Sequence, residues 1–294
     1  MRVTSEMMVT GSLRRLQDRL ASYERAQVEL SSGRRVNSPS DDPAQAGRGL
    51  VLRGAIQSRE QELRAATDAR SLVERADAEL QDGMNVLHRI RDLTVRAGSE
   101  TGTAERQAIA AEIEQLQQQL VGVANSEHRG RALFAGFTDG PAVGQVAGTW
   151  TYLGDQGQIV RRVSEQDRVQ VNVHADDLFG LGGGTDTFTA LDDLRTAILA
   201  DDDAGIQTGL GAVDDAMDRF NDGLSAVGAS QNRIDAARTR TEGSLLNLRT
   251  ELSDVEDVDI SEAIMEMELQ EVAYQATLAA LGRALPDSLV SFLR

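Results

Sequence analysis

A glycine-rich segment, FGLGGGTD at residues 179–186, has the composition of a loop that holds phosphate. Such loops surround phosphate oxygens with backbone N–H groups, and their signature ends in Lys followed by Ser or Thr. This segment ends in Thr185 and Asp186 instead, and no strong strand pattern precedes it. The sequence therefore argues against a nucleotide-binding loop at this place.

Acidic and histidine side chains are the remaining candidates for metal chemistry. Asp201, Asp202 and Asp203 are consecutive, but they lack the spaced glycine and the closing bidentate glutamate of a calcium loop, so they indicate a solvated turn. The chain has no cysteine, and paired catalytic carboxylates need a pocket that no pattern marks. We therefore predict no catalytic residue, no cofactor and no metal site. No two of the histidines have metal-ligand spacing: His88, His128 and His174.

Composition favours helices over a thick globular core. Of the 294 residues, 40% are hydrophobic but only 3% are aromatic, a mixture that suits long helices packed along seams. All 30 basic residues are arginine, and the formal net charge of -17 argues against nucleic acid or an anionic membrane surface as a partner.

No stretch approaches the ~20 apolar residues of a membrane span. Charges interrupt the N-terminal segment too early for a signal peptide, so any export would not use a cleaved one.

Apolar residues spaced by three and four mark an amphipathic helix at each end of the chain. The first helix is expected over residues 5–32 and ends at Gly33, a residue type that favours the left-handed cap conformation. The last helix is expected to begin after a cap at Asp259 or Ser261 and to stop at Pro286. The predicted seam residues are Leu13, Leu16, Leu20, Tyr23 and Leu30 in the first helix, and Ile264, Met267, Tyr274, Leu278, Leu281 and Leu285 in the last.

A linker, RRVNSPSDDPAQA, separates the first helix from the second. Asp41 and Asp42 precede Pro43, so we predict a capped helix start with proline at the first helical position and Gln45 closing a capping box. The second helix should end near residues 97–98, and Thr103 is expected to cap a third. After a short helix near residues 191–199, residues 206–255 keep one unbroken register, which at ~1.5 Å per residue gives a helix of roughly 75 Å.

The middle of the chain has a different character. Residues 135–185 are rich in glycine and contain TWTYL, QIVRRV and RVQVNV, whose period-two alternation predicts short strands. The predicted fold is mainly α: a long antiparallel helical rod of coiled-coil type, built from both chain ends, with a small β-rich insertion in the middle. Its predicted parts are residues 1–42 (assembly helix and linker), 43–134 (first half of the rod), 135–185 (β-rich domain), 186–255 (second half) and 256–294 (C-terminal assembly helix).

Two end segments carry a family resemblance. LSSGRRVNSPSDDPAQA at residues 30–46 resembles the N-terminal signature of flagellins and hook-associated proteins, and residues 257–293, from DVDISEAIMEME to the end, resemble their C-terminal one. Within that superfamily, three features are similar to the hook–filament junction family (hook-associated protein 3). These features are the SPSDDP linker, GRALFAGFTDG at residues 130–140, and the strands that follow YLGDQGQ.

The resemblance implies a structural protein, not an enzyme. It implies export through the flagellar type III apparatus with the help of an export chaperone, and an extracellular place in the flagellum. The terminal helices would assemble with other copies of the chain into a ring, between the first hook-associated protein and flagellin. A short flagellin that forms the filament itself is the alternative, and a cytoplasmic coiled-coil scaffold or an enzyme with a helical shell are rivals from other classes. Filament formation by the purified chain alone would favour the flagellin.

Overall fold

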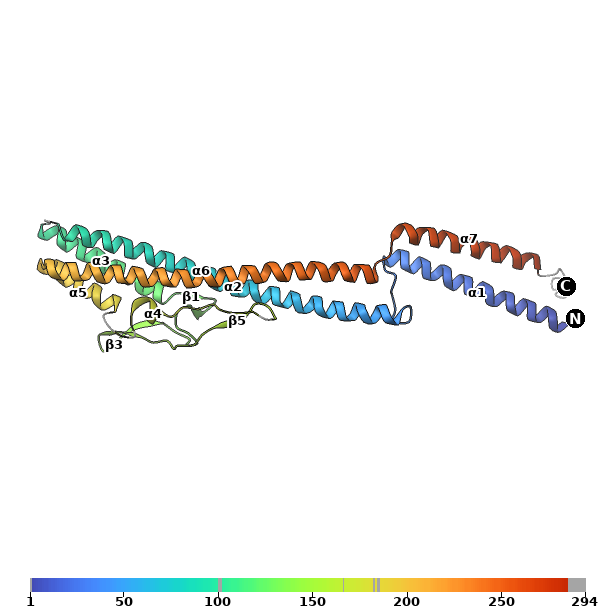
Figure 1. The fold of residues 1–294 in the computed structure, drawn as a ribbon, viewed down its shortest axis with the longest axis horizontal. Helices are drawn as coiled ribbons and strands as arrows, with labels where there is room; N and C mark the ends of the chain where they lie inside the picture. The colour runs from blue at the N-terminus through green and yellow to red at the C-terminus, as the bar shows by residue number, and fades with distance from the viewer. Residues whose placement is uncertain (1, 100–101, 166, 182, 184–185, 285–294) are drawn as a thin grey trace, which may run out of the picture. The chain divides into compact units, whose positions relative to one another are not determined.

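The computed structural model describes residues 2–99, 102–165, 167–181, 183 and 186–284 (Figure 1). The chain divides into two compact units. Unit 1 comprises the two chain ends, Met1–Ser58 and Ser244–Arg294, and unit 2 comprises the middle, Arg59–Gly243. Two long helices, α2 (Pro43–Ala97) and α6 (Asp203–Glu256), contribute residues to both units.

Unit 1 pairs helices from opposite ends of the sequence. The N-terminal helix α1 (Arg2–Ser32) and the C-terminal helix α7 (Ile260–Ala284) run antiparallel and lie side by side (Figure 1). Helix α1 ends where Gly33 takes a φ of 69°, and the Gly33 N–H donates to the carbonyl of Glu29 at 2.9 Å. Glycine adopts this left-handed conformation at little cost, which explains why the helix stops there.

Unit 2 holds the main hydrophobic core. Its helices are the remainder of α2 and α6, with α3 (Thr103–Ala124) and α5 (Thr187–Ala200). Aromatic side chains from three elements meet in this core: the rings of Phe179 and Phe188 lie 4.8 Å apart, and Phe220 contacts Phe179 edge-on at 5.2 Å. All three side chains are fully buried. With few aromatic residues in the chain, this cluster ties α5 and α6 to the β-rich region.

The β-rich region consists of three two-stranded antiparallel hairpins and a short helix in the described part of the chain. It begins before the predicted boundary at residue 135, because two strands already lie at residues 127–132. After the last strand, residues Ala175–Phe179 form the short helix α4. The elements are β1 (Glu127–His128), β2 (Arg131–Ala132), β3 (Val143–Val146), β4 (Thr149–Tyr152), β5 (Val160–Arg162), β6 (Arg168–Gln170) and α4 (Ala175–Phe179).

Two expected helix caps are wrong in detail. Helix α3 has Gly102 at its N-cap, and Thr103 is already the first helical residue, so the Thr103 side chain does not cap it. The side-chain oxygen of Gln45 is buried and has no hydrogen-bond partner, so Gln45 does not close a capping box. Asp259, by contrast, accepts from the N–H groups of Ser261 and Glu262 at the start of α7.

The mainly α fold with long terminal helices packed against each other and a small β-rich insertion is confirmed. Among the helices as far as they are described, none combines the length and apolar character that crossing a bilayer requires.

Candidate assembly surface

The seam between α1 and α7 is built from one aromatic pair and several small residues. The rings of Tyr23 and Tyr274 stack at 6.4 Å with an interplanar angle of 11°. Ala26 and Ala263 are buried at the same seam, and the small side chains let the two backbones approach. The polar residues Gln270 and Thr277 are half-buried. The contact is therefore narrow and only partly apolar, weaker than a continuous leucine seam.

The structure divides the predicted seam residues into two groups. The half-buried group lies at or next to the contact between the two helices: Leu16, Tyr23, Leu30, Met267, Tyr274 and Leu281. The exposed group remains open to solvent in this subunit: Leu13, Leu20, Ile264 and Leu278. Leu285 lies outside the described residues. Four of the ten described seam residues are therefore not covered by the intrachain contact.

A second apolar stripe on α7 was not predicted. Met265, Leu269 and Val272 are 65%, 61% and 64% exposed. Their spacing of four and three residues places them on one face of the helix, away from the Tyr274 side of the contact. The sequence does contain this pattern, because the three residues follow a second spacing of four and three residues beside that of the predicted seam. An apolar stripe this exposed has no partner within the described residues of the subunit.

An apolar groove of about 590 Å³ lies where the first turns of α2 pass the last turns of α6 in unit 1. Leu52 and Val255 line it with Val51, whose side chain is exposed, and the neighbouring Leu50 is exposed as well. Contiguous exposed apolar surface marks interaction sites in soluble proteins. Unit 1 thus exposes apolar side chains on both of its helix pairs.

The linker between α1 and α2 is held by two adjacent carboxylates. Oδ2 of Asp41 accepts from the N–H groups of Asn37 and Ser38, at 3.2 and 2.7 Å. Oδ1 of Asp42 accepts from the N–H groups of Ala44 and Gln45, both at 3.0 Å. Pro43 is the first residue of α2, where its missing N–H costs nothing. Asp41 therefore shapes the loop and Asp42 caps the helix.

The two linkers of unit 1 are also joined to each other. Gly33 accepts at its carbonyl from the N–H of Val258 at 3.1 Å, and Arg34 and Asp257 form an antiparallel bridge. The carbonyl of Glu256 accepts from the N–H of Arg35 at 2.7 Å. These backbone bonds connect residues more than 220 positions apart, so they fix where the terminal helices leave the long ones.

In unit 2, the segment GRALFAGFTDG is organised around Asp155. Its Oδ1 accepts from the N–H groups of Phe137 and Gly157, at 2.8 and 2.7 Å, and Oδ2 accepts from the Thr138 hydroxyl at 3.1 Å. These bonds, first of all the one from Phe137, lower the pKa of Asp155. Gly136 has a φ of 72°, and a Cβ there would collide with the Asp155 backbone. The turn therefore requires both residues.

Tyr152 completes this arrangement. Its hydroxyl donates to the carbonyl of Asp155 at 2.7 Å. Burial, followed by the charges of Asp176, Asp155 and Asp177, raises the pKa of Tyr152, so the phenol remains a neutral donor at physiological pH.

Asp201, Asp202 and the ends of the glycine-rich segment have structural roles at helix ends. Asp201 ends α5 with a φ of 59° and pairs with Arg106 at 2.6 Å. Asp202 accepts at Oδ1 from the N–H of Ala204 at the start of α6. In the glycine-rich segment, Gly180 ends α4 with a φ of 69° and Asp186 caps α5, while Gly182, Gly184 and Thr185 lie outside the described residues.

The histidines lie on three separate elements. His88 is exposed on α2, His128 is half-buried on β1, and His174 is buried at the N-cap of α4. Potential ligand atoms of His174, Asp176 and Asp177 lie within 4.8 Å of one another. The sequence pattern did not predict this grouping. His174 Nε2 lies 3.1 Å from the Gly157 carbonyl, and the two carboxylates occupy the first turn of α4, where the helix dipole favours negative charge.

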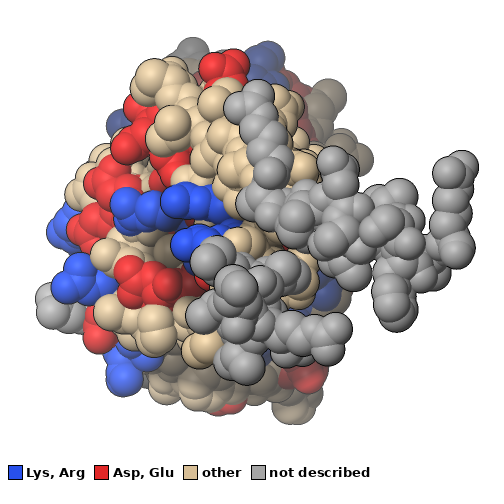
Figure 2. Space-filling model, turned by 90° about the vertical axis from the view of Figure 1, so that its right-hand side faces the viewer, with Lys and Arg blue, Asp and Glu red and all other residues tan. Residues whose placement is uncertain are grey.

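The chain has an excess of acidic over basic residues. Figure 2 shows acidic and basic side chains interspersed with neutral ones over the visible described surface. Many of the arginines pair with carboxylates on neighbouring turns or helices, as Arg91 does with Asp214 at 2.7 Å. This mixed surface and the net charge of -17 favour contacts with proteins over contacts with polyanions.

Two models of known protein families match this chain, one at each end. The model of the bacterial flagellin N-terminal helical region matches residues 3–139, and that of the C-terminal helical region matches residues 210–293. Flagellin of Bacillus subtilis (strain 168) is 27% identical over 100% of both chains. Flagellar hook-associated protein 3 of Escherichia coli (strain K12) is 25% identical over 95% of this chain and 96% of that protein.

Among solved structures, a putative flagellar hook-associated protein from Vibrio parahaemolyticus has a TM-score of 0.70 and 20% identity, covering 74% of this chain and 100% of that chain. The flagellar junction protein FlgL from Legionella pneumophila has a TM-score of 0.61 and 16% identity, covering 71% and 99%. These likenesses show a shared fold. Because the two flagellin helical regions match most of the sequence, one at each end, the chain belongs to the bacterial flagellin family.

Proposed function

We propose that this chain is the structural subunit that joins the flagellar hook to the filament, and that it has no enzymatic role. The observation that carries the proposal is the match to Escherichia coli hook-associated protein 3 over nearly the full length of both chains. The turn around Asp155 supports it, because the residues in that turn are those that resemble the junction family. The fold shared with hook-associated structures is consistent with this role.

In this proposal the α1–α7 pair is the assembly element. Its intrachain contact is narrow, and the exposed apolar residues of both helices are left for neighbouring subunits to cover. The subunit is exported unfolded with the help of an export chaperone, and it acts outside the cell. It contacts other copies of itself in a ring, the first hook-associated protein on one side and flagellin on the other.

Deletion of the gene in the bacterium that encodes it tests this function. A junction subunit should leave hooks without filaments in electron micrographs, with intact flagellin shed into the medium. Normal filaments in the deletion strain would contradict the proposal.

A short flagellin is the second candidate, because flagellin of Bacillus subtilis matches the chain over its whole length. The two functions predict different behaviour of the purified chain. A flagellin should polymerise into long filaments on added filament seeds, whereas a junction subunit should not.

A further inference from the structure

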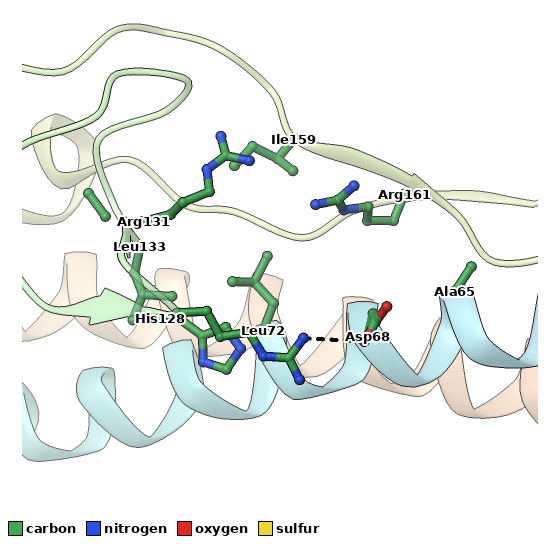
Figure 3. A pocket seen from close by; sticks show the side chains of 10 residues that line it. Ala65, Asp68, Leu72, His128, Arg131, Leu133, Ile159 and Arg161 are labelled. Carbon is green, nitrogen blue, oxygen red and sulfur yellow. Dashed lines mark hydrogen bonds and ion pairs between the residues drawn. The ribbon is translucent and has the colours of Figure 1, made fainter.

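A cavity of about 260 Å³ opens in unit 2 between α2 and the β1–β2 hairpin (Figure 3). Its floor is apolar and comes from Leu72 on α2, Ala132 on β2 and Leu133 directly after it. Leu133 and Ala132 belong to the buried core, so the floor is fixed by packing. Small-molecule sites usually measure about 300–1,000 Å³. This cavity is slightly smaller, a size that suits a single side chain.

The rim of the cavity is basic. Arg129, Arg131 and Arg161 line it, and Asp68 is the one carboxylate among the lining residues. Asp68 pairs with Arg129, with Oδ1 and Nη1 3.4 Å apart. The side chains of Arg131 and Arg161 make no hydrogen bond or ion pair with any described residue. In Figure 3 their guanidinium groups lie on opposite sides of the Ile159 side chain, which also lines the cavity.

Two unpaired arginines that converge are unusual for this chain. Carboxylates outnumber basic groups by 47 to 30, and most arginines of α2 in unit 2 have acidic partners, as Arg59 does with Glu62 at 2.8 Å. Solvated arginines normally spread apart, because like charges held together repel one another. Here the hairpin and β5 place two of them over an apolar floor with no carboxylate between them.

The backbone of the β1–β2 hairpin positions Arg129 and Arg131. Arg129 and Gly130 form its two-residue turn, with φ angles of 53° and 77°. Such a turn matches the twist of the strands but favours Asn followed by Gly, and a residue with a Cβ is strained at the first position. The strained residue is itself part of the rim. Arg131 follows immediately on β2, so its direction depends on this turn.

We propose that this pocket binds a carboxylate side chain of an acidic protein segment. The carboxylate lies between the guanidinium groups of Arg131 and Arg161, and its aliphatic stem lies on Leu72 and Leu133. A planar guanidinium matches a carboxylate with two parallel hydrogen bonds, which explains arginine at both positions. The net charge of -17 disfavours a long polyanion such as nucleic acid. The inference concerns unit 2 alone and does not depend on the flagellar function.

The test uses the full chain and a fluorescein-labelled hexaglutamate peptide, with a hexaglutamine peptide as the neutral probe. Arg131→Gln combined with Arg161→Gln should weaken hexaglutamate binding, measured by fluorescence anisotropy, by about tenfold or more. The matched control is Arg64→Gln with Arg168→Gln, which removes two other exposed arginine charges of unit 2 outside the pocket. The control should bind like the parent. Thermal melts of both variants should match the parent, because neither pair belongs to the core.

Three results would overturn the proposal. The first is equal hexaglutamate affinity in the parent and the Arg131, Arg161 variant, which includes no binding to either. The second is equal loss of affinity in both double variants, which would assign binding to net charge. The third is displacement of the peptide by inorganic phosphate at lower concentration than by glutarate, which would make the pocket a phosphate site.

Discussion

Nη2 of Arg53 lies 2.6 Å from Oε2 of Glu256, so an ion pair joins the start of α2 to the last residue of α6. Glu256 is only 5% exposed, and Gly49 leaves the space that its carboxylate occupies. The carbonyl of the same residue receives the N–H of Arg35 from the first linker. One residue thus connects both long helices and the linker of the N-terminal helix.

Glu256→Ala should loosen this connection without unfolding unit 2. The variant leaves Arg53 without its carboxylate, and because Arg53 is partly exposed, the expected cost is about 1–2 kcal/mol and not the full value of a buried pair. Hydrogen exchange of the amides in residues 33–42 should become faster by the factor that corresponds to this loss of free energy. Glu268→Ala removes an exposed carboxylate of α7 and serves as the control. Unchanged protection in the linker would show that Glu256 does not fasten it.

The linker caps give a second prediction. Replacing Asp41 and Asp42 together with Ala removes the acceptors for four backbone N–H groups, and the loss of the Asp42 cap should cost ~1 kcal/mol of local helix stability. Pro43→Ala should change little, since a capped helix start tolerates many residues. Hydrogen exchange in the first turn of α2 and a motility assay measure the difference. A double variant that behaves like Pro43→Ala in both would contradict the role of the caps.

The sequence predicted the helix limits of unit 1 well for a local reason. Gly33 and Pro43 act through their own backbone conformations, so they mark the end of α1 and the start of α2 wherever the helices pack. The seam was harder to place. Ala263, Gln270 and Thr277 lie in the contact but have little apolar signal, whereas close packing of two helices favours such small or adaptable residues.

Polar contacts between separate parts of the chain could not be predicted from the spacing of apolar residues. The pair of Arg53 and Glu256 and the turn around Asp155 join segments that are separate in the sequence, and periodicity says nothing about such contacts. The basic pocket of unit 2 likewise combines α2 with two hairpins. Only the overall fold allows such sites to be located.

A glycine in the middle of α2 provides a third prediction. Gly83→Ala would normally stabilise a helix, but here the new Cβ would overlap Cε1 of Phe220, whose ring is fully buried against Phe179. Overpacking of this kind should cost about 1–3 kcal/mol and lower the melting temperature. Gly211→Ala in α6, where nothing lies within 4 Å of the new atom, should stabilise by about 1 kcal/mol. The same sign for both variants would contradict this account.

Asp155 predicts a dependence of stability on pH. Its pKa is lowered in the folded state, so its contribution is complete above the unfolded value of about 3.9 and is lost as the pH falls through the folded pKa. Asp155→Asn should therefore be less stable than the parent at neutral pH, and the difference should shrink below about pH 4. Urea unfolding followed between pH 2.5 and 7 measures it. Asp139→Asn, at an exposed position of the same segment, should leave the curve unchanged. A difference that grows on acidification would contradict the sign.

The last prediction separates assembly from folding. Leu269 and Val272 are exposed on α7 and lie outside the Tyr274 contact, so replacing both with Asp should leave the melting temperature of the isolated chain nearly unchanged. In the assembled state the two charges would be placed in an apolar interface. An unpaired buried charge costs several kcal/mol, more than a narrow helix contact can offset. Incorporation into flagella, measured by immunoblot of sheared filaments and by swimming in soft agar, should be lost.

Two controls make the result decisive. Gln57→Asp with Ser58→Asp adds the same charge to exposed polar positions of α2 in unit 1 and should assemble normally, because those positions are not part of the apolar stripe. Val213→Asp places a charge in the core of unit 2, where Val213 is 1% exposed, and should unfold the chain outright. If the Leu269, Val272 variant swims like the parent, the stripe is not an assembly surface. If its melting temperature instead falls toward that of Val213→Asp, the stripe is buried in the free subunit, because a solvent-exposed charge would not destabilise the fold to that degree.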